Sequence, residues 1–435
     1  MKICVVGTGY VGLVSGTCLA EMGNEVICVD SDLNKINNLK NGVVPIFEPG
    51  LEELINTNVK ENRLKFSTDL KNAIEKSLIC FIAVGTPQNN DGSANLEQVY
   101  EVAQDIGKYI NDYKVIVSKS TVPVGTCDKI KKSIQEYTNC DFDVLSNPEF
   151  LKQGSAVEDF LKPDRVIIGS DSPKAIEIMK ELYSPFLRTG NPVITMDIKS
   201  AEMTKYASNS FLAMKVSFAN EIANICEAIG ADADMVRIGM SSDKRIGSQF
   251  LFAGLGYGGS CFPKDIQALI KMAEENSCES NLLQATDLVN KKQRENFVNK
   301  IKTRFGSDLN GKIFAIWGLS FKPKTNDMRE APSITIINEL IKCGAKIKAY
   351  DPKAMITAKV HFGDKISYAN SSYEALCGAD ALLLLTEWNE FRRPDFERVK
   401  YSLNKPIIFD GRNQYNGQVL LKQGFEYYCV GKSFY

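Results

Sequence analysis

The chain alternates short runs of β-branched residues with helical stretches over its first 200 residues, and this alternation limits the folds open to it. The runs occupy residues 3–6, 26–30, 79–84, 115–119 and 166–169. Strands that alternate with helices usually form a parallel sheet, because each helix returns the chain to the edge from which the next strand starts. This part of the sequence therefore predicts a doubly wound α/β domain.

A different pattern fills the middle of the chain. From about residue 200 to residue 305, strand signals are absent and helical periodicity covers residues 201–229 and 264–301. After Gly311 the strands resume, and residues 312–318 partly echo residues 2–7. We predict an α/β fold with two Rossmann-like domains with parallel sheets, residues 1–199 and 306–435, and ligand in the crevice between them. We predict that a central helical region, residues 200–305, joins the two domains; such a region commonly carries a dimer contact.

Composition excludes several classes of protein. A net charge of −1 provides no basic surface for nucleic acid or an anionic membrane, and no apolar run reaches the ~20 residues of a membrane span. The twelve cysteines lack paired spacing, which predicts a reduced, cytoplasmic protein. The one histidine, His361, lies far from every motif below, so we predict no metal site and no Ser-His-Asp or Cys-His pair.

A glycine-rich segment follows the first predicted strand. It reads Gly7-Thr8-Gly9-Tyr10-Val11-Gly12, opens a predicted helix, and is followed 18 residues later by Asp30 at the end of the second strand. Such glycines allow pyrophosphate to approach the helix N-terminus, and the aspartate accepts hydrogen bonds from ribose hydroxyls. A chance glycine turn is the alternative. Because Asp30 would repel a 2′-phosphate, the segment predicts NAD rather than NADP.

One cysteine lies in a setting that suits a nucleophile. Cys261 stands between a glycine-rich run, residues 254–259, and the turn Phe262-Pro263-Lys264-Asp265. Glycines let a ligand approach the backbone, the proline stiffens the exit, and the charge of Lys264 favours thiolate over thiol. A thiolate beside a nicotinamide indicates oxidation through a covalent thioester.

Lys205 and Asn209 are four residues apart on a predicted helix, where they share a face with small and apolar residues. A lysine and an amide are costly to bury without a purpose. We predict that they donate hydrogen bonds to a developing oxyanion. The alternative is a solvated helix face from which Lys205 extends into water.

Two loops follow late strands of the first predicted domain, at the edge where a doubly wound sheet binds ligands. Residues 121–126 read TVPVGT, and residues 147–151 read NPEFL. Glu149 is a candidate for holding or deprotonating water, with Thr121 as a hydroxyl partner. A purely structural role for Glu149 in a proline turn is equally open.

Three further charged residues have two interpretations each. Asp265, four positions after Cys261, either orients a hydrolytic water or caps the helix that follows. Arg245 and Lys322 flank glycine- or proline-rich turns, where they either hold a diphosphate or are ordinary surface cations.

Taken together, these motifs resemble those of the nucleotide-sugar dehydrogenases, and the similarity runs nearly from end to end. Tyr257 stands where that family more often has phenylalanine, which is a small departure. The matching features are the GxGYVG opening, TVPVGT, NPEFL followed by Gly154-Ser155-Ala156, Lys205 with Asn209, GGSCFPKD at 258–265, residues 321–329, and DGRN at 410–413.

The resemblance implies a four-electron oxidation of a sugar C6 alcohol by two molecules of NAD. Cys261 would capture the aldehyde as a thiohemiacetal, which is oxidised to a thioester that water hydrolyses to the uronic acid. Lys205 and Asn209 would stabilise the oxyanions. Thr121, Glu149 and Asp265 would position the water.

The same resemblance implies the binding residues. The counterpart of Arg245 reaches in from the partner subunit, which implies a homodimer or a higher homo-oligomer. The NAD site would comprise Gly7, Gly9, Tyr10, Val11, Gly12, Asp30, Lys35, Thr86, Thr121, Glu149, Lys264 and Arg329. The nucleotide sugar would contact Glu149, Phe150, Leu151, Lys152, Lys205, Asn209, Arg245, Phe250, Leu251, Phe252, Ala253, Gly254, Gly258 and Lys322.

We expect UDP-glucose to be the substrate. UDP-N-acetylmannosamine and GDP-mannose are the alternatives within the family, because they suit the same architecture and cysteine. A two-electron hydroxyacid dehydrogenase that uses Lys205 and Asn209, with Cys261 a bystander, is a more distant alternative. From a different class, the chain could be an NAD-binding redox sensor that uses Cys261 as a switch.

Overall fold

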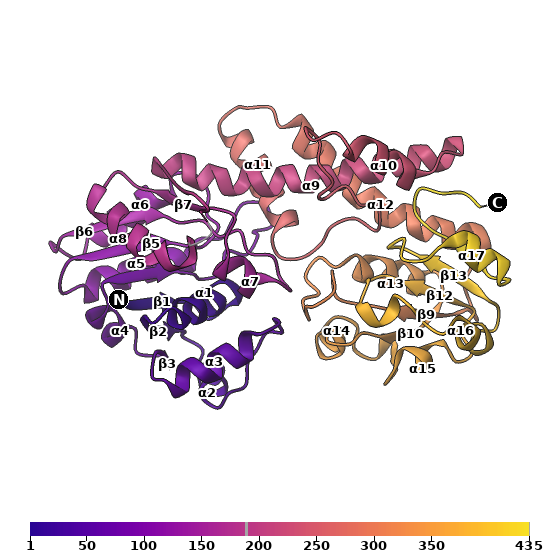
Figure 1. Cartoon of the computed structure of the whole chain (residues 1–435), viewed down its shortest axis with the longest axis horizontal. Helices are drawn as coiled ribbons and strands as arrows, with labels where there is room; N and C mark the ends of the chain where they lie inside the picture. Colours follow the sequence, from indigo (N-terminus) through magenta and orange to yellow (C-terminus); the bar gives the residue numbers. More distant parts are fainter. Residues whose placement is uncertain (188–189, 435) are drawn as a thin grey trace. The chain divides into compact units, whose positions relative to one another are not determined.

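The computed structural model describes residues 1–187 and 190–434, which form two compact units (Figure 1). Unit 1 comprises Met1–Ser208 and Gln267–Asn276, and unit 2 comprises Asn209–Ile266 and Ser277–Tyr435. Each unit contains one sheet with helices packed against it. The predicted helical middle is divided between the two units, and its definition as a separate domain stays a prediction.

Unit 1 is built on an eight-stranded sheet in the order β3-β2-β1-β4-β5-β6-β7-β8. The first six positions follow the order of dinucleotide-binding sheets, with the switch point between β1 and β4. The five strand runs expected in this half of the chain are all present. The strands are β1 (Lys2–Val6), β2 (Glu25–Val29), β3 (Leu64–Ser67), β4 (Ile79–Ile82), β5 (Lys114–Ser118), β6 (Phe142–Ser146), β7 (Val166–Gly169) and β8 (Val193–Met196).

Helices cover this sheet and bury its β-branched residues; the side chains of Ile3, Val5, Ile79 and Val117 have no exposed surface. The helices are α1 (Tyr10–Glu21), α2 (Leu33–Lys40), α3 (Leu51–Lys60), α4 (Leu70–Lys76), α5 (Glu97–Tyr109), α6 (Thr126–Gln135), α7 (Ala156–Leu161) and α8 (Pro173–Tyr183), which continues into the short η1 (Ser184–Leu187).

One junction of the sheet departs from the parallel pattern, because β7 runs antiparallel to β6. The only helix between these strands is α7, with six residues. At 1.5 Å per residue it spans only about 9 Å, too little to carry the chain back along the sheet. The chain therefore starts β7 from the end at which β6 finishes, and β8 pairs in parallel with β7.

Unit 2 contains a six-stranded, fully parallel sheet in the order β11-β10-β9-β12-β13-β14, which repeats the order of the first six strands of unit 1. This repeat gives a structural basis for the predicted echo between the two halves of the sequence. The strands are β9 (Ile313–Trp317), β10 (Lys346–Tyr350), β11 (Ser367–Tyr368), β12 (Ala381–Leu384), β13 (Ile407–Asp410) and β14 (Glu426–Tyr428).

Two helices contribute residues to both units. They are α9 (Ile198–Ile229), which is continuous over 32 residues, and α11 (Phe262–Glu275). The other helices of unit 2 are α10 (Ala233–Ser241), α12 (Asn281–Phe305), α13 (Pro332–Lys342), α14 (Met355–Phe362), α15 (Ser372–Leu376), α16 (Phe396–Ser402) and α17 (Gly417–Lys422), with short 3₁₀ turns η2 (Gly363–Lys365) and η3 (Asn389–Phe391).

Candidate active site

The glycine segment after β1 has the shape that a pyrophosphate site requires. Gly7 has φ +101°, and a Cβ there would lie 2.6 Å from the Ala83 carbonyl oxygen. A Cβ on Gly12 would overlap the carbonyl oxygen of Gly7. A Cβ on Gly9 would meet no atom within 4 Å, and no side chain caps the N-terminus of α1 at this residue. Gly7 and Gly12 are thus required by the fold, whereas the space at Gly9 is open to a ligand.

Asp30 lies directly after β2, and its carboxylate is partly exposed to solvent. The carboxylate accepts hydrogen bonds from the Thr8 amide at 2.8 Å and hydroxyl at 2.7 Å, and from Lys35 Nζ at 2.8 Å. Burial, the largest influence, raises the pKa of Asp30, but the bonds from Lys35 and Thr8 outweigh it and lower the pKa to about 2. Asp30 is therefore ionised and correctly placed to accept from a ribose.

The equivalent carboxylate of unit 2 is buried, and its oxygens are already hydrogen-bonded within the protein. Asp351, directly after β10, is 1% exposed. It accepts hydrogen bonds from the backbone amides of Leu319, Lys353 and Ala354 and, at 3.0 Å, from the indole of Trp388. No lone pair is left to face a ribose, so only the sheet of unit 1 keeps the features of a dinucleotide site.

Lys205 of α9 pairs with Glu149 inside unit 1. Lys205 Nζ lies 2.8 Å from Glu149 Oε1, and each side chain is 4% exposed. The second carboxylate oxygen accepts from the Leu151 amide at 2.6 Å. Burial, the largest influence, raises the pKa of Glu149, but Lys205 and the amide outweigh it and hold the pKa below its ordinary value. The solvated alternative for Lys205 is wrong, since its side chain is buried.

The other predicted loop of unit 1, residues 121–126, is held in place by hydrogen bonds. Glu202, one turn before Lys205 on α9 and 2% exposed, accepts from the amides of Gly125 and Cys127 in the TVPVGT segment. Thr86 Oγ donates to the Thr121 carbonyl at 2.9 Å. Glu202 was not singled out from the sequence, where the available signal was an acid three positions before Lys205 on the same predicted helix.

Asn209 and Asp265 form a second buried contact, within unit 2. Asn209 Nδ2 donates to Asp265 Oδ2 at 2.6 Å, and Lys264 Nζ lies 2.5 Å from Asp265 Oδ1. Asp265 has no exposed surface and is the fourth residue of α11, which begins at Phe262. A position inside the helix does not fit a capping residue, and the described bonds of the carboxylate go to side chains.

Cys261 is partly exposed and precedes the first residue of α11. The sulfur lies 3.7 Å from Ser260 Oγ, and the guanidinium of Arg329 is close enough to interact electrostatically with it. The Gly259 amide also donates to the Arg329 carbonyl at 2.8 Å. A helix N-terminus and a cation both favour negative charge on a sulfur, so this setting suits a nucleophilic thiolate.

A set of buried amides and one guanidinium shapes the glycine loop before Cys261. Asn290 and Arg294 of α12 bond to the backbone of Tyr257, while Gln293 donates to the Gly254 carbonyl at 2.8 Å. Asn220 of α9 accepts from the Gly254 amide. Sequence reasoning missed these residues; the available signal was three polar residues at spacing i, i+3 and i+4, followed on the same helix face by the apolar Phe297, Val298 and Ile301.

Of the predicted sugar-binding residues of unit 2, Phe250 lies close to Cys261, whereas Phe252 and Arg245 are exposed. Phe250, with φ +64°, contacts Phe262 beside Cys261 at a ring distance of 6.1 Å. Phe252 is 59% exposed, and Arg237 lies over its ring. Arg245 is 90% exposed, with its described ion pair to Asp243, so this single chain does not place it in a pocket.

The remaining predicted residues lie as follows. In unit 1, the ring of Phe150 lies under the guanidinium of Arg165 and within 5.3 Å of Lys205 Nζ, and Lys152 pairs with Asp159 on the surface. In unit 2, Lys322 Nζ lies over the ring of Phe321, which itself packs against Gly259.

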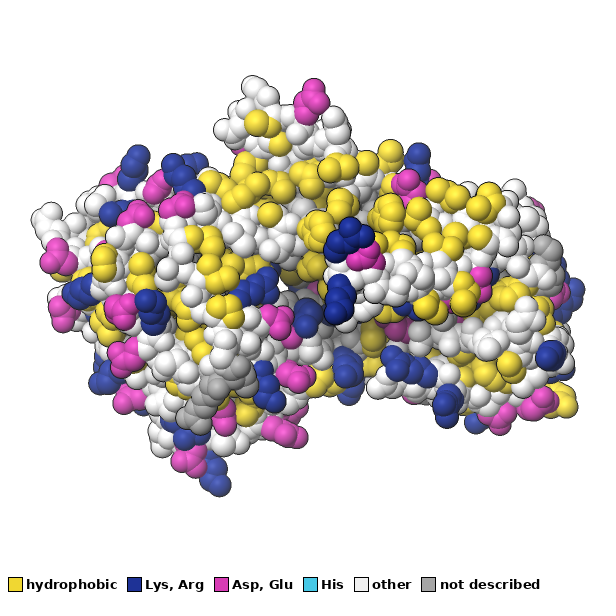
Figure 2. All heavy atoms as spheres, turned by 45° about the horizontal axis from the view of Figure 1, so that its top comes forward, with side chains coloured by type: hydrophobic (Ala, Val, Ile, Leu, Met, Phe, Trp, Pro, Cys, Tyr) yellow, Lys and Arg dark blue, Asp and Glu magenta, His cyan; other side chains and the backbone are white. Residues whose placement is uncertain are grey.

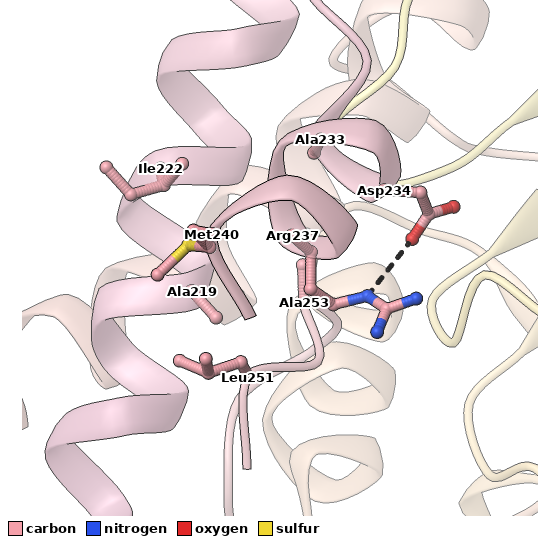
Figure 3. Close-up of a pocket in the computed structure, with 8 residues that line it drawn as sticks. All are labelled: Ala219, Ile222, Ala233, Asp234, Arg237, Met240, Leu251 and Ala253. Atoms are coloured by element: carbon pink, nitrogen blue, oxygen red, sulfur yellow. Dashed lines mark ion pairs between the residues drawn. The ribbon is translucent and has the colours of Figure 1, made fainter. Parts of the chain in front are cut away.

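A small apolar pocket lies in unit 2 between α9, α10 and residues 251–253 (Figure 3). Ile222, Met240 and Leu251 line it, and the Arg237–Asp234 ion pair of 3.8 Å lies at one side. The pocket contains no nucleophile and no acid–base pair. Among the described residues, no cluster of three or more His, Cys, Asp or Glu side chains is arranged to hold a metal ion.

Comparison with known proteins places this geometry in a family. Residues 1–187 match the NAD binding domain of the UDP-glucose/GDP-mannose dehydrogenase family, residues 199–292 its central domain, and residues 315–417 its UDP binding domain. The chain belongs to the UDP-glucose/GDP-mannose dehydrogenase family. It is an enzyme that uses NAD, and the predictions of the nucleotide-sugar dehydrogenase fold and of this cofactor are confirmed.

Relatives of this dehydrogenase cover almost its whole length. UDP-glucose 6-dehydrogenase TuaD of Bacillus subtilis is 48% identical over 99% of this chain and 93% of its own. UDP-glucose 6-dehydrogenase of Rhizobium meliloti is 46% identical over 99% of this chain and all of its own. A UDP-glucose dehydrogenase structure from Pyrobaculum islandicum superposes with TM-score 0.92 at 34% identity and covers 99% of this chain and 98% of the other. No helix of the described residues has the length and apolarity needed to cross a membrane.

Proposed function

We propose that this dehydrogenase oxidises the C6 alcohol of UDP-glucose to the carboxylate of UDP-glucuronate. The observation that supports this choice of sugar is the identity to proteins named UDP-glucose 6-dehydrogenase, 48% and 46% over nearly the full chain. Solved UDP-N-acetylmannosamine dehydrogenases are less similar, with 27% identity to the enzyme of Staphylococcus aureus. The match to a domain described as UDP binding agrees with this choice.

When bound, NAD would supply the hydride acceptor for both oxidations. The open space at Gly9, the uncapped N-terminus of α1 and the ionised Asp30 fit its pyrophosphate and ribose. We assign the remaining contacts by family membership to Tyr10, Val11, Lys35, Thr86, Lys264 and Arg329.

Cys261 provides the covalent step. Its thiolate adds to the C6 aldehyde and forms a C–S bond, which gives a thiohemiacetal; loss of the second hydride leaves a thioester. Water then attacks the acyl carbon, the C–S bond breaks, and the thiolate is regenerated. Overall, one alcohol, one water and two NAD⁺ give one carboxylate, two NADH and three protons. The position of Cys261 before α11 and close to Arg329 supports this role.

The two buried contacts supply the polar groups that these steps need. The ammonium of Lys205 and the amide of Asn209 stand four residues apart on α9, a spacing that puts both on one helix face, and they stabilise the oxygen anions. Glu149, kept ionised by Lys205, accepts a proton from water, with Thr121 as hydroxyl partner. Asp265, held by Asn209 and Lys264, is assigned by family membership to orienting the hydrolytic water.

The residues that hold the nucleotide sugar are assigned by family membership. We propose that Phe150, Leu151 and Lys152 in unit 1 and Lys322 with the loop from Phe250 to Gly258 in unit 2 hold it. Arg245 is 90% exposed in the single chain, which is consistent with a role toward a second subunit.

We therefore propose a homodimer formed through the central helices. Figure 2 shows hydrophobic side chains exposed along this part of the molecule. On α9 and α10 they include Phe218 at 48%, Ile229 at 73% and Met235 at 63% exposure, an apolar surface of the kind that marks a subunit interface. Among the described residues no disulfide joins any of the cysteines, which supports a cytoplasmic location.

A panel of nucleotide sugars tests the proposal. UDP-glucose, UDP-N-acetylmannosamine and GDP-mannose are supplied side by side, and NADH is followed by fluorescence. We expect turnover with UDP-glucose and two NADH for each sugar. A Cys261→Ser variant should give no steady turnover. One NADH per substrate with a fully active Cys261→Ser variant would indicate a two-electron dehydrogenase, and no turnover with any sugar would favour a redox sensor.

A further inference from the structure

Unit 1 contains a second buried ammonium beside the Lys205–Glu149 pair, and the mechanism above does not use it. Lys119 follows β5 directly and is 5% exposed. Its Nζ donates to Asn147 Oδ1 at 2.9 Å and to Tyr183 Oη at 3.3 Å, and it lies 5.7 Å from the ring centroids of Phe160 and Tyr183. None of these partners is an anion. A buried lysine with neutral partners is costly, so its retention calls for a reason.

The charged groups that face Lys119 come from two other elements. Glu149 lies on the loop after β6, and Lys205 lies on α9; α7 and α8 contribute only Phe160 and Tyr183. Burial, the largest influence, lowers the pKa of Lys119 to about 7, while Glu149 acts in the opposite direction and Lys205 in the same direction as burial. Lys119 in turn lowers the pKa of Glu149.

The hydrogen bonds of Lys119 also connect it to Glu149 through the backbone. Asn147 Oδ1 accepts from both Lys119 and Tyr183, the latter at 2.7 Å, and Asn147 Nδ2 donates to the Ile167 carbonyl at 2.8 Å. The side-chain amide of Asn147 is therefore held from both its oxygen and its nitrogen. Asn147 stands two residues before Glu149, so the network fixes the start of the NPEFL loop.

We propose that Lys119 is a positioning residue that holds the Glu149 loop in place and that, in the acidic range where its amine is protonated, it helps to keep Glu149 in its carboxylate form. The proposal rests on the function proposed above, in which Glu149 must be ionised to accept a proton from water. Lys205 and Lys119 thus share one carboxylate: the first by direct contact, the second through charge and through Asn147.

The test is the pH dependence of kcat in Lys119→Met, a substitution that keeps the length and removes the charge. With less positive charge nearby, Glu149 binds its proton at higher pH. We expect the acidic limb of the profile to move upward by about one pH unit. Lys114→Met is the matched control: Lys114 is 3% exposed and lies at the other end of β5. Loss of the Lys114 ammonium should lower the melting temperature but should not shift the acidic limb of the pH profile of kcat.

Two further variants complete the design. Tyr183→Phe removes a hydrogen-bond partner and keeps both charges, so its limb should move less than that of Lys119→Met. Lys119→Arg keeps the charge and should retain the wild-type limb. A folded Lys119→Met enzyme with an unshifted limb would overturn the proposal, as would failure of both Lys119 variants to fold, which would make Lys119 a core residue only. Failure of the proposed function would appear separately, in the NADH stoichiometry and in Cys261→Ser.

Discussion

Lys205 Nζ and Glu149 Oε1 lie 2.8 Å apart in the interior of unit 1, although 56 residues separate them in the chain. Each group makes the burial of the other tolerable, because the opposite charges compensate for the hydration that both lose. The contact therefore links the stability of unit 1 to the charge state of a proposed catalytic carboxylate.

Breaking this pair should cost both activity and stability. Lys205→Met removes the direct ion-pair partner of a buried carboxylate, and breaking a buried pair typically destabilises a protein by about 3–5 kcal/mol. Urea denaturation and NADH production measure the two effects. The double variant Lys205→Met with Glu149→Leu should regain stability and remain inactive, since the buried charges are gone together with the chemistry. A double variant as unstable as the single one would show that the ion pair is not the cause.

Asp265→Asn should slow hydrolysis of the thioester more than it slows the two oxidations that form the thioester. The amide keeps the volume of the carboxylate but cannot orient water as an anion does, and loss of such a group typically lowers kcat by about 10²–10⁴-fold. We expect a rapid burst of NADH and accumulation of enzyme that carries the mass of a sugar thioester. Intact-protein mass spectrometry after mixing with UDP-glucose detects this adduct, and Cys261→Ser, which cannot form it, serves as the control.

Two glycines of the NAD segment should respond differently to alanine. Gly9→Ala fills open space in the free enzyme, so its melting temperature should match the wild type, while NAD affinity falls because the methyl group occupies the approach to the backbone. In Gly12→Ala the new methyl would overlap the Gly7 carbonyl, so the free enzyme itself should be destabilised. Thermal unfolding with and without NAD separates the two, and equal loss of stability in both would contradict the assignment.

The Asp30 carboxylate should contribute stability in a defined pH window. Its pKa is lowered from 3.8 to about 2 on folding. A lowered carboxyl pKa stabilises the folded state above the unfolded pKa, and this contribution disappears as pH falls through the folded value. The difference in unfolding free energy between wild type and Asp30→Asn should thus be constant above about pH 5 and shrink between about pH 4 and pH 2. A difference that does not change over that window would show that the carboxylate is not responsible.

Asp30 should also decide the choice of cofactor. With Asp30→Gly, the Lys35 ammonium loses its carboxylate partner and becomes available to a 2′-phosphate. We expect the KM for NAD to rise and measurable activity with NADP to appear. Asp30→Gly with Lys35→Ala is the control and should lose NAD affinity without gaining NADP activity.

Much of the fold was accessible from local sequence patterns. The runs of β-branched residues became strands because their side chains pack on both faces of a parallel sheet, and the glycine segment with Asp30 formed the expected turn because its requirements are local. The antiparallel β6–β7 junction was not expected, since it depends on a helix too short to cross the sheet. The closure of Asp351 by Trp388 was equally hidden, because those residues are 37 positions apart.

For the candidate site, the sequence by itself determined which residue types are present and which of them share a helix face: Cys261 after its glycines, and Lys205 four residues before Asn209. Only the tertiary structure decided that Lys205 is buried against Glu149, that Asp265 bonds to Asn209, and that Lys119 stands beside the same carboxylate. The physical reason is that burial and charge pairing depend on segments distant in the chain, whereas turn and helix geometry depend on neighbours. A lysine in a strand-end sequence looks the same whether it faces water or a buried carboxylate.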